Sequence, residues 1–534
     1  MSAVETRDGV DNLRVLDEAL KRRTIAVISH PDAGKSTLTE ALLLHAHAIG
    51  EAGATHGKAG RRATVSDWMT MEKERGISIS SAAIQFTHRD TIINLVDTPG
   101  HADFSEDTYR VLAAVDAAIM LVDAAKGLEA QTMKLFEVCK RRGIPLITMI
   151  NKWDRPGGDA LALMDEIEKR TGLFPTPLTW PVGESGDFRG LVDCDSGQFV
   201  RFHRTAGGAT IASEETVPAE DATAIAGPAW QTAVEETGLL REEGHRHDES
   251  LFLSAASTPV LFGAAALNIG VRQLLDTLVD LAPSAEARAD TSGVRRAVNS
   301  AFSGFVFKVQ SGMDSNHRDR VAFVRVCSGV FERGMTVTHE PSGRPFATKY
   351  AQQMFGKDRE TVDTAWPGDI VGLINASALR PGDTLFMGGP VVYPPMPRFQ
   401  PEHFRAARST DSSKHKQFRK GIEQLDHEGV IQVLHSDRRG DQTPILAAVG
   451  PMQFEVATER MANEYRAPIA FDALPYTVAC LIDAETAKVL AKHSSTEVTM
   501  ASDGRLIALF ANEWKLRTLR REHPELTLDS ISAE

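Results

Sequence analysis

At 534 residues the chain is too long for one hydrophobic core and predicts several domains. Its 42% hydrophobic and 25% charged content is typical of a globular protein, and a net charge of −13 argues against a general coat for nucleic acid. The longest apolar run, 111–125, is interrupted by Asp116 and Asp123, which excludes a membrane span. The polar first residues lack a secretory signal, and four widely separated cysteines indicate reduced thiols. We expect a cytoplasmic monomer with no membrane or DNA partner.

The first third of the chain alternates apolar runs with helical patterns. Strands are expected, in chain order, at 24–29, 82–88, 91–97, 117–125, 145–151 and 258–265, with helices at 36–49 and 270–282. The pair at 82–97 surrounds a turn at Arg89 and Asp90 and supplies an antiparallel hairpin. This alternation predicts an α/β domain over 1–285, with a mostly parallel sheet and helices on both faces.

The rest of the chain has a different texture. Residues 184–256 are rich in Gly, Ala, Thr and Glu and predict a loop-rich insertion, and 282–296 resembles a linker. Short β-branched runs between Gly and Pro turns predict an antiparallel β-barrel over 296–392. Mixed helical and strand patterns after Pro394 and Pro395 predict a C-terminal α+β domain over 393–534.

The segment SHPDAGKST, 29–37, has the layout of a phosphate-binding loop between a strand and a helix. It meets the spacing G-x-x-x-x-G-K-[ST], except that Ser29 stands in the first glycine position. Gly34 lets the backbone approach phosphates, Lys35 reaches the β and γ phosphates, and Ser36 offers a hydroxyl to Mg²⁺. The candidate phosphate-binding residues here are Ser29, His30, Pro31, Asp32, Ala33, Gly34, Lys35, Ser36 and Thr37.

The segment DTPGH follows the second strand of the hairpin. Asp97 ends that strand and is expected to bind Mg²⁺ through water, and the Gly100 N–H is positioned to meet the γ phosphate. Thr98 and Pro99 complete the candidate phosphate contacts. Because this motif lies one hairpin after a phosphate loop, it makes a nucleotide site much more specific than either motif alone.

The segment NKWD, after a third strand, identifies the base. Asp154 can accept both N1–H and N2–H₂ of guanine, an edge that adenine does not present. Lys152 can pack over the ring, Asn151 can tie this loop to the phosphate loop, and Trp153 completes the motif. A buried carboxylate left unpaired by the wrong base gives a selectivity of roughly 10⁴ or more. The sequence therefore predicts a GTP site.

Two supporting residues carry less specific signals. Ser78, in EKERGISIS, offers a hydroxyl that can complete Mg²⁺ coordination when GTP is bound, or belongs to a basic turn before a strand. Ala265, in FGAAALN, offers a backbone N–H to guanine O6, or simply ends a core strand.

These ordered motifs, HPDAGKST, RGISIS, DTPGH and NKWD, resemble those of the translational GTPases. The resemblance places His101 where that family carries its catalytic histidine, which orients the attacking water on the ribosome. It extends nearly end to end to the family's termination factors, through LTWPVG, WPGDIVGL and VGPMQFEV. Ser36 replaces the usual threonine, Ala264 replaces the usual Ser/Thr, and 200–250 match poorly.

The resemblance implies a ribosome-stimulated GTPase that removes class-I release factors from the ribosome after peptide release, with Mg²⁺ as cofactor. It implies the ribosome and class-I release factors as partners. Two alternatives remain open: a translocase or ribosome-protection factor of the same family, and a stress-related regulator that uses GTP only as a switch. The length after the barrel disfavours the first alternative, because those factors carry additional domains.

Overall fold

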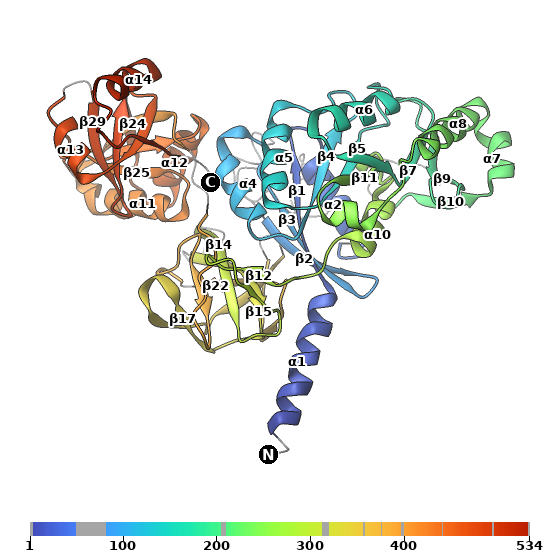
Figure 1. Ribbon diagram of the computed structural model, residues 1–534, viewed down its shortest axis with the longest axis horizontal. Coiled ribbons are helices and arrows are strands. Elements are labelled where there is room, and N and C mark those ends of the chain that lie inside the picture. Colours follow the sequence, from blue (N-terminus) through green and yellow to red (C-terminus); the bar gives the residue numbers. More distant parts are fainter. Residues whose placement is uncertain are drawn as a thin grey trace.

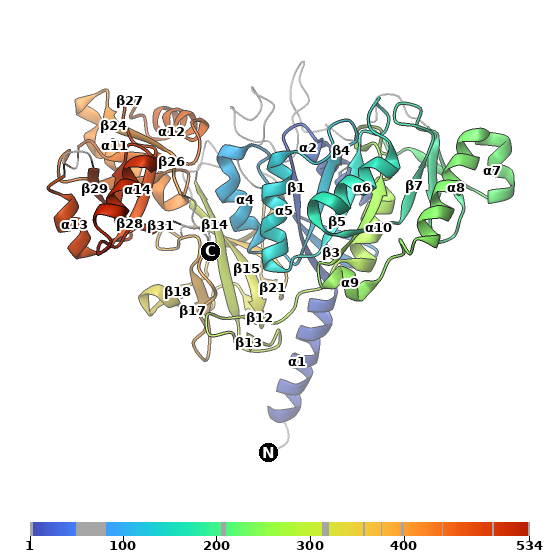
Figure 2. The same ribbon diagram turned by 45° about the horizontal axis from the view of Figure 1, so that its top comes forward.

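The computed structural model describes residues 4–49, 82–203, 210–311, 320–355, 358–374, 376–396, 400–440, 442–493 and 496–531. These residues form an α/β domain that carries the predicted GTP motifs (hereafter the G domain), a β-barrel and a C-terminal domain in chain order (Figure 1). The barrel contacts one side of the G domain, and the C-terminal domain lies beside helix α4 of the G domain in both views (Figures 1 and 2).

The G domain is built on a mixed sheet. Its strands are β1 (Arg22–Ser29), β2 (Ala82–His88), β3 (Thr91–Asp97), β4 (Ala117–Asp123), β5 (Leu146–Asn151), β6 (Phe174–Pro177) and β11 (Ser257–Phe262). They lie in the order β2-β3-β1-β4-β5-β11-β6. Only the β2–β3 pairing is antiparallel among these neighbours, and both residues of its turn, Arg89 and Asp90, have positive φ. The predicted hairpin and parallel sheet are confirmed.

Helices cover both faces of this sheet. One face carries α2 (Lys35–His45) and α10 (Val271–Leu281), and the other carries α4 (Ser105–Leu112), α5 (Ala130–Arg142) and α6 (Ala160–Thr171). Short 3₁₀ turns lie at η1 (Ala102–Phe104) and η3 (Ala265–Leu267). Alternate residues of β1 enter the two cores: Ile25 and Val27 pack with the α2 side, Ala26 and Ile28 with the α4 side.

The insertion differs from its expected texture. Residues 184–256 were expected to be rich in loops, but they contain regular elements: β8 (Gly190–Asp193), β9 (Phe199–His203), β10 (Ser213–Val217), α7 (Ala219–Ala226), α8 (Pro228–Glu242) and α9 (Glu249–Leu253). With β7 (Thr179–Val182) the strands form a sheet in the order β10-β9-β8-β7. The expectation of a loop-rich segment was wrong. Alanine and glutamate are strong helix formers, so a segment rich in them can fold into helices. The ring N–H of Trp180 in β7 donates to Glu236 of α8 at 2.8 Å and anchors the helices.

Helix α1 (Val4–Leu20) was not predicted, and it projects away from the molecule (Figures 1 and 2). Its N-terminal end is the part that projects, whereas its C-terminal half contacts the rest of the protein. Arg14 lies 5.1 Å from the Trp366 ring of the barrel, and Glu18 pairs with Arg22 at 2.7 Å.

The barrel is a curled antiparallel sheet. A linker hairpin, β12 (Arg288–Ala289) and β13 (Arg295–Arg296), precedes β14 (Ser303–Ser311), β15 (Arg320–Ser328), β16 (Phe331–Glu332), β17 (Thr336–His339), η4 (Glu340–Ser342), β18 (Arg344–Ala347), β19 (Ala351–Phe355), β20 (Asp358–Thr361), β21 (Thr364–Ala365), β22 (Ile370–Ile374) and β23 (Thr384–Phe386). The order is β18-β17-β23-β14-β15-β22-β19, and β19 also pairs with β2 of the G domain.

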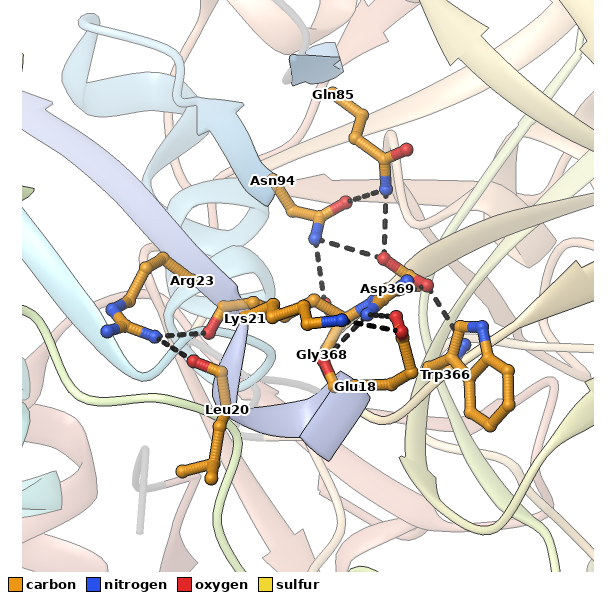
Figure 3. A network of polar contacts seen from close by, with 10 residues as sticks. Glu18, Leu20, Lys21, Arg23, Gln85, Asn94, Trp366, Gly368 and Asp369 are labelled. Carbon is orange, nitrogen blue, oxygen red and sulfur yellow. Dashed lines mark hydrogen bonds and ion pairs between the residues drawn. The ribbon is translucent and has the colours of Figure 1, made fainter. Parts of the chain in front are cut away.

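A polar network joins the barrel to the G domain (Figure 3). The carboxylate of Asp369, in the turn before β22, is 2.8 Å from Arg22 Nε and 2.9 Å from Gln85 Nε2. Asn94 and Thr24 donate to the carbonyl of Gly368 at 3.1 and 2.7 Å. These partners come from β1, β2 and β3, so one barrel turn binds three strands that lead to or from the predicted nucleotide motifs.

The C-terminal domain is α+β, as expected. Its elements are β24 (His403–Ser409), η5 (Ser412–Lys414), α11 (His415–Glu428), β25 (Gln432–His435), β26 (Ile445–Ala448), α12 (Met452–Asn463), β27 (Ile469–Ala473), β28 (Val478–Ile482), α13 (Ala484–Leu490), β29 (Thr496–Ala501), β30 (Leu506–Phe510), α14 (Glu513–Glu522) and β31 (Asp529–Ser530). The sheet order is β27-β24-β26-β25-β29-β30-β28-β31. Within the described ranges, no helix is long and apolar enough to cross a membrane.

Candidate active site

The three predicted motifs meet at one edge of the G-domain sheet. Ser29, Asp97 and Asn151 are the last residues of β1, β3 and β5, which run parallel. Their carboxyl ends therefore open on the same side. β1 lies between β3 and β4, so the chain leaves β1 at a point where the strand order reverses, the usual place for a ligand crevice in an open α/β sheet.

The phosphate loop has the backbone that the motif requires. Gly34, at the N-cap of α2, has φ of 98°, and a Cβ there would lie 2.6 Å from the Asn151 amide nitrogen. Asp32 has φ of 67°, and Lys35 is the first residue of α2. Backbone N–H groups and the positive end of the helix dipole thus face the space beyond β1. The other loop residues of the motif, Pro31, Ala33, Ser36 and Thr37, lie in this turn and the first turn of α2.

Ser29 and His30, at the start of the phosphate loop, are held by contacts with other protein groups. The Ser29 hydroxyl donates to the carbonyl of His30 at 2.9 Å. The ring of His30 is buried, and its Nδ1 lies 2.6 Å from Glu129 Oε2. Burial lowers the pKa of His30, and the opposing effect of Glu129 is smaller. Neither ring nitrogen makes a hydrogen bond to the described residues, so the close approach to Glu129 is the polar contact of the ring.

The DTPGH segment approaches the phosphate loop. Asp97 is buried at the end of β3, and Thr98 donates to the carbonyl of Val27 at 2.6 Å, which fixes the segment to β1. The Pro99 carbonyl accepts from Thr108 of α4 at 3.3 Å. A Cβ on Gly100 would lie 3.3 Å from Lys35 Nζ, so the structure brings the lysine amine against this glycine.

His101 lies at the surface beside the same segment. Its side chain is 32% exposed, and Nδ1 faces the Asp103 carboxylate at 3.4 Å. The Asp103 N–H also donates to His101 Nδ1 at 3.3 Å. The imidazole is thus oriented by the turn η1 that follows it.

Asn151 connects the base loop to the phosphate loop. Its amide donates to the carbonyl of Ala33 at 2.9 Å, and its carbonyl oxygen accepts the N–H of Ala265 at 2.9 Å. The first contact agrees with the role expected for Asn151. The second shows that the Ala265 N–H has a protein acceptor, so its expected contact with guanine O6 stays a prediction.

The remaining NKWD residues have distinct environments. Lys152, at φ 66°, donates to the carbonyl of Asp32 and lies 2.8 Å from Asp123 Oδ2. Trp153 is buried, and its ring N–H donates to Gly183 at 3.1 Å, so its ring belongs to the core. Asp154 follows at intermediate exposure. Ser78 lies outside the described residues.

Sequence reasoning missed Asp123. It ends β4 next to Asn151 in register, and its carboxylate fixes Lys152. Burial raises the pKa of Asp123, but the Lys152 ammonium and the Ala125 N–H together hold that pKa below its ordinary value. An aspartate at the carboxyl end of a buried strand was the available signal, because such ends share one edge of the sheet.

Comparisons with known proteins agree with this geometry. Family models match three consecutive segments: the elongation factor Tu GTP binding domain over 20–284, elongation factor G domain 2 over 301–388, and the class II release factor RF3 C-terminal domain over 393–520. A solved crystal structure of a protein from Thermus thermophilus superposes with a TM-score of 0.67 at 24% identity, covering 86% of this chain and 68% of that one. That likeness shows the fold.

The fold, the converging motifs and the first of these matches define a GTPase with the G domain of the elongation factors. Two curated relatives are each 45% identical over 98% of this chain: peptide chain release factor 3 of Synechococcus elongatus, with 95% of its length covered, and of Gloeobacter violaceus, with 100% covered. The same-named protein of Symbiobacterium thermophilum is 44% identical over 96% of this chain and 97% of its own. The chain belongs to the peptide chain release factor 3 family.

Proposed function

We propose that this protein uses GTP on the terminating ribosome to speed the departure of class-I release factors after peptide release. The observation that carries the role is the near full-length similarity to peptide chain release factor 3, which includes the C-terminal domain specific to that family. The same similarity supports a monomeric, cytoplasmic protein with the ribosome as its main partner.

Each motif has a role in GTP binding and hydrolysis. Backbone N–H groups of 32–37 and of Gly100 bind the phosphates, the Lys35 ammonium neutralises their charge, and Asp154 reads guanine. His101 orients the attacking water. The bridge from Asn151 to Ala33 supports this assignment, because it makes base binding and phosphate binding parts of one rigid site.

The residues at the phosphate end fit Mg²⁺. The hydroxyl of Ser36 and the carboxylate of Asp97 are hard oxygen donors, which Mg²⁺ prefers, and they lie at the ends of neighbouring elements α2 and β3. We assign Ser36 as a ligand, Asp97 as a ligand through water, and Ser78 as a ligand in the GTP-bound form. When bound, Mg²⁺ supplies charge neutralisation of the β and γ phosphates.

We divide the chain into a G domain at 1–285, with an insertion at 184–256, a barrel at 296–392 and a C-terminal domain at 393–534. The segments matched by family models, 20–284, 301–388 and 393–520, support these boundaries.

The decisive experiment uses ribosomes stalled after peptide release with a fluorescently labelled class-I factor. Adding the protein with GTP should speed departure of the label, while the rate of peptide release at saturating class-I factor stays unchanged. If the label leaves at the same rate with and without the protein, and tRNA–mRNA movement accelerates instead, the translocase alternative is correct.

The hydrolytic role is tested by His101→Ala. This variant should retain GTP binding and still eject the labelled factor, but lose ribosome-stimulated turnover by about 10² or more, because one water-orienting group is removed. The variant should consequently remain on the ribosome longer. Stimulated turnover near wild type would show that His101 is only structural.

A further inference from the structure

Asp103 connects the histidine of the DTPGH segment to the C-terminal domain. It lies in η1, two residues after His101, and is buried. Its Oδ1 lies 3.4 Å from His101 Nδ1, while its Oδ2 accepts the backbone N–H of Met452 at 2.7 Å. One carboxylate therefore contacts two groups that are far apart in the sequence and belong to different domains.

Met452 is the first residue of α12, and the N-cap position is Pro451. Proline has no side-chain acceptor, and while the N–H groups of Gln453 and Phe454 donate to nearby backbone carbonyls, that of Met452 needs an acceptor from elsewhere. A carboxylate is the favoured partner, because the helix N-terminus carries partial positive charge. Asp103 thus caps α12 across the boundary between the G domain and the C-terminal domain.

Gly450 provides the space for this contact. A Cβ on Gly450 would lie 2.1 Å from Asp103 Cγ and 2.2 Å from its Oδ1, so alanine cannot occupy this position while Asp103 is in place. Gly450 has no positive φ, so its lack of a side chain serves the approach of Asp103 and not the backbone conformation.

Further contacts surround the capped end of α12. Phe104 packs against Val456 of α12. Arg110 of α4 donates to the carbonyls of Glu428 and Gly429 at 3.3 and 3.4 Å. A cavity of about 60 Å³ lies beside these residues at the junction with the barrel, so the contact is not packed on every side. The apolar contact across this boundary is small: it consists of Phe104 and Val456, with Val430 and Met452 packed against them.

We propose that Asp103 is a positioning residue for GTP hydrolysis, through which the docked C-terminal domain holds the imidazole of His101 in place. With α12 docked, the Met452 N–H fixes Oδ2 of Asp103 and thereby holds the η1 turn, whose Asp103 N–H donates to Nδ1 of His101. With α12 displaced, the carboxylate loses its anchor and His101 loses its orientation. This inference rests on the proposed function of His101 in orienting water.

The test compares kcat and KM for GTP in ribosome-stimulated turnover for Asp103→Ala, Asp103→Asn, Gly450→Ala and the double variant Asp103→Ala/Gly450→Ala. Gly389→Ala is the matched control, because a Cβ at Gly389 meets no described atom within 4 Å and its φ is not positive. Binding of a fluorescent GDP analogue and the circular dichroism spectrum report whether each variant folds.

Asp103→Ala should lower kcat about 10-fold to 10²-fold, since a misplaced catalytic group costs this much, with KM for GTP within about twofold of wild type. Asp103→Asn keeps an acceptor for Met452 and should restore most of kcat. Gly450→Ala should lower kcat to the same level as Asp103→Ala. The double variant should be no slower than Asp103→Ala, because truncating Asp103 removes the atoms with which the new Cβ collides.

A nuclear magnetic resonance measurement checks whether these substitutions act on kcat through the His101 ring. The ring proton resonances of His101 should shift in Asp103→Ala and in Gly450→Ala, and stay unchanged in Gly389→Ala. If Asp103→Ala and Gly450→Ala keep wild-type kcat while His101→Ala lowers it, the inference is wrong and the proposed function stands. If His101→Ala also keeps wild-type kcat, the proposed role of His101 in hydrolysis is wrong, and the inference on Asp103 is wrong with it.

Discussion

Arg325 of the barrel binds Asp116 of the G domain through both carboxylate oxygens, at 2.9 and 2.6 Å. The Arg325 side chain is 1% exposed, and it also donates to the carbonyl of Ala114. Among the described residues, the carboxylate that neutralises this guanidinium in the middle of β15 comes from another domain. This pair and the Asp369 network lie next to each other, because Arg325 is paired with Ile370 across β15 and β22, and together they fix the barrel on the G domain.

Asp116→Ala should therefore destabilise the protein strongly. Removing one partner of a buried pair leaves an uncompensated charge, at a cost of about 3–5 kcal/mol. Urea unfolding followed by tryptophan fluorescence measures the change. Asp363→Ala is the control, because Asp363 pairs with Arg333 at 2.7 Å in an exposed position and should cost less than about 1 kcal/mol. Equal shifts for both variants would contradict the burial of the Arg325 pair.

Gly34→Ala should abolish binding of guanine nucleotides. The new Cβ would lie 2.6 Å from the Asn151 amide at a φ of 98°, so the phosphate loop and the base loop would be forced apart. Gly143→Ala separates strain from collision: φ there is 64°, and no described atom lies within 4 Å of the added Cβ. It should cost about 1–2 kcal/mol of stability and leave affinity unchanged. Titration with a fluorescent GDP analogue distinguishes the two.

Asp154→Asn should weaken GTP binding and favour xanthosine triphosphate, because the 2-oxo group of xanthine suits an amide donor. Competition of each nucleotide against fluorescent GDP gives the ratio of affinities. Asp187→Asn is a suitable control, since Asp187 pairs with Arg189 at the surface. Unchanged GTP affinity, with no gain for the xanthine nucleotide, would show that Asp154 does not read the base.

The C-terminal domain should lose stability at low pH through Asp483. Hydrogen bonds from the Thr527 hydroxyl and the Thr486 N–H lower the pKa of Asp483 to about 2 from 3.8. Because the folded-state pKa is below the unfolded one, this stabilisation is present above about pH 4 and is lost as the pH falls towards 2. The melting temperature should depend less on pH across this range for Asp483→Asn, because asparagine keeps the helix cap and does not titrate. An equal dependence of melting temperature on pH in the two proteins would contradict this prediction.

Local patterns predicted much of the G domain. The strands β2 and β3 and the turn at Arg89 follow from short-range alternation and match the structure residue by residue. The motifs indicate a phosphate loop and a base loop because each is a contiguous segment at a strand end, and their contacts with the nucleotide stay predictions. The contact of Asp103 with Met452 could not be found this way, because it joins residues 349 positions apart. The same is true of Asp116 with Arg325, since each reads alone as a charge interrupting an apolar run.

The pairing of β19 with β2 has a consequence for anyone who divides this protein. In a fragment that ends before the barrel, β2 would lose the pairing of Ile84 with Phe355 of β19. An unpaired strand edge can pair with further strands, including those of other copies of the chain, and favours aggregation. The barrel thus covers the edge strand β2 at Ile84, and the G domain and the barrel are best expressed together.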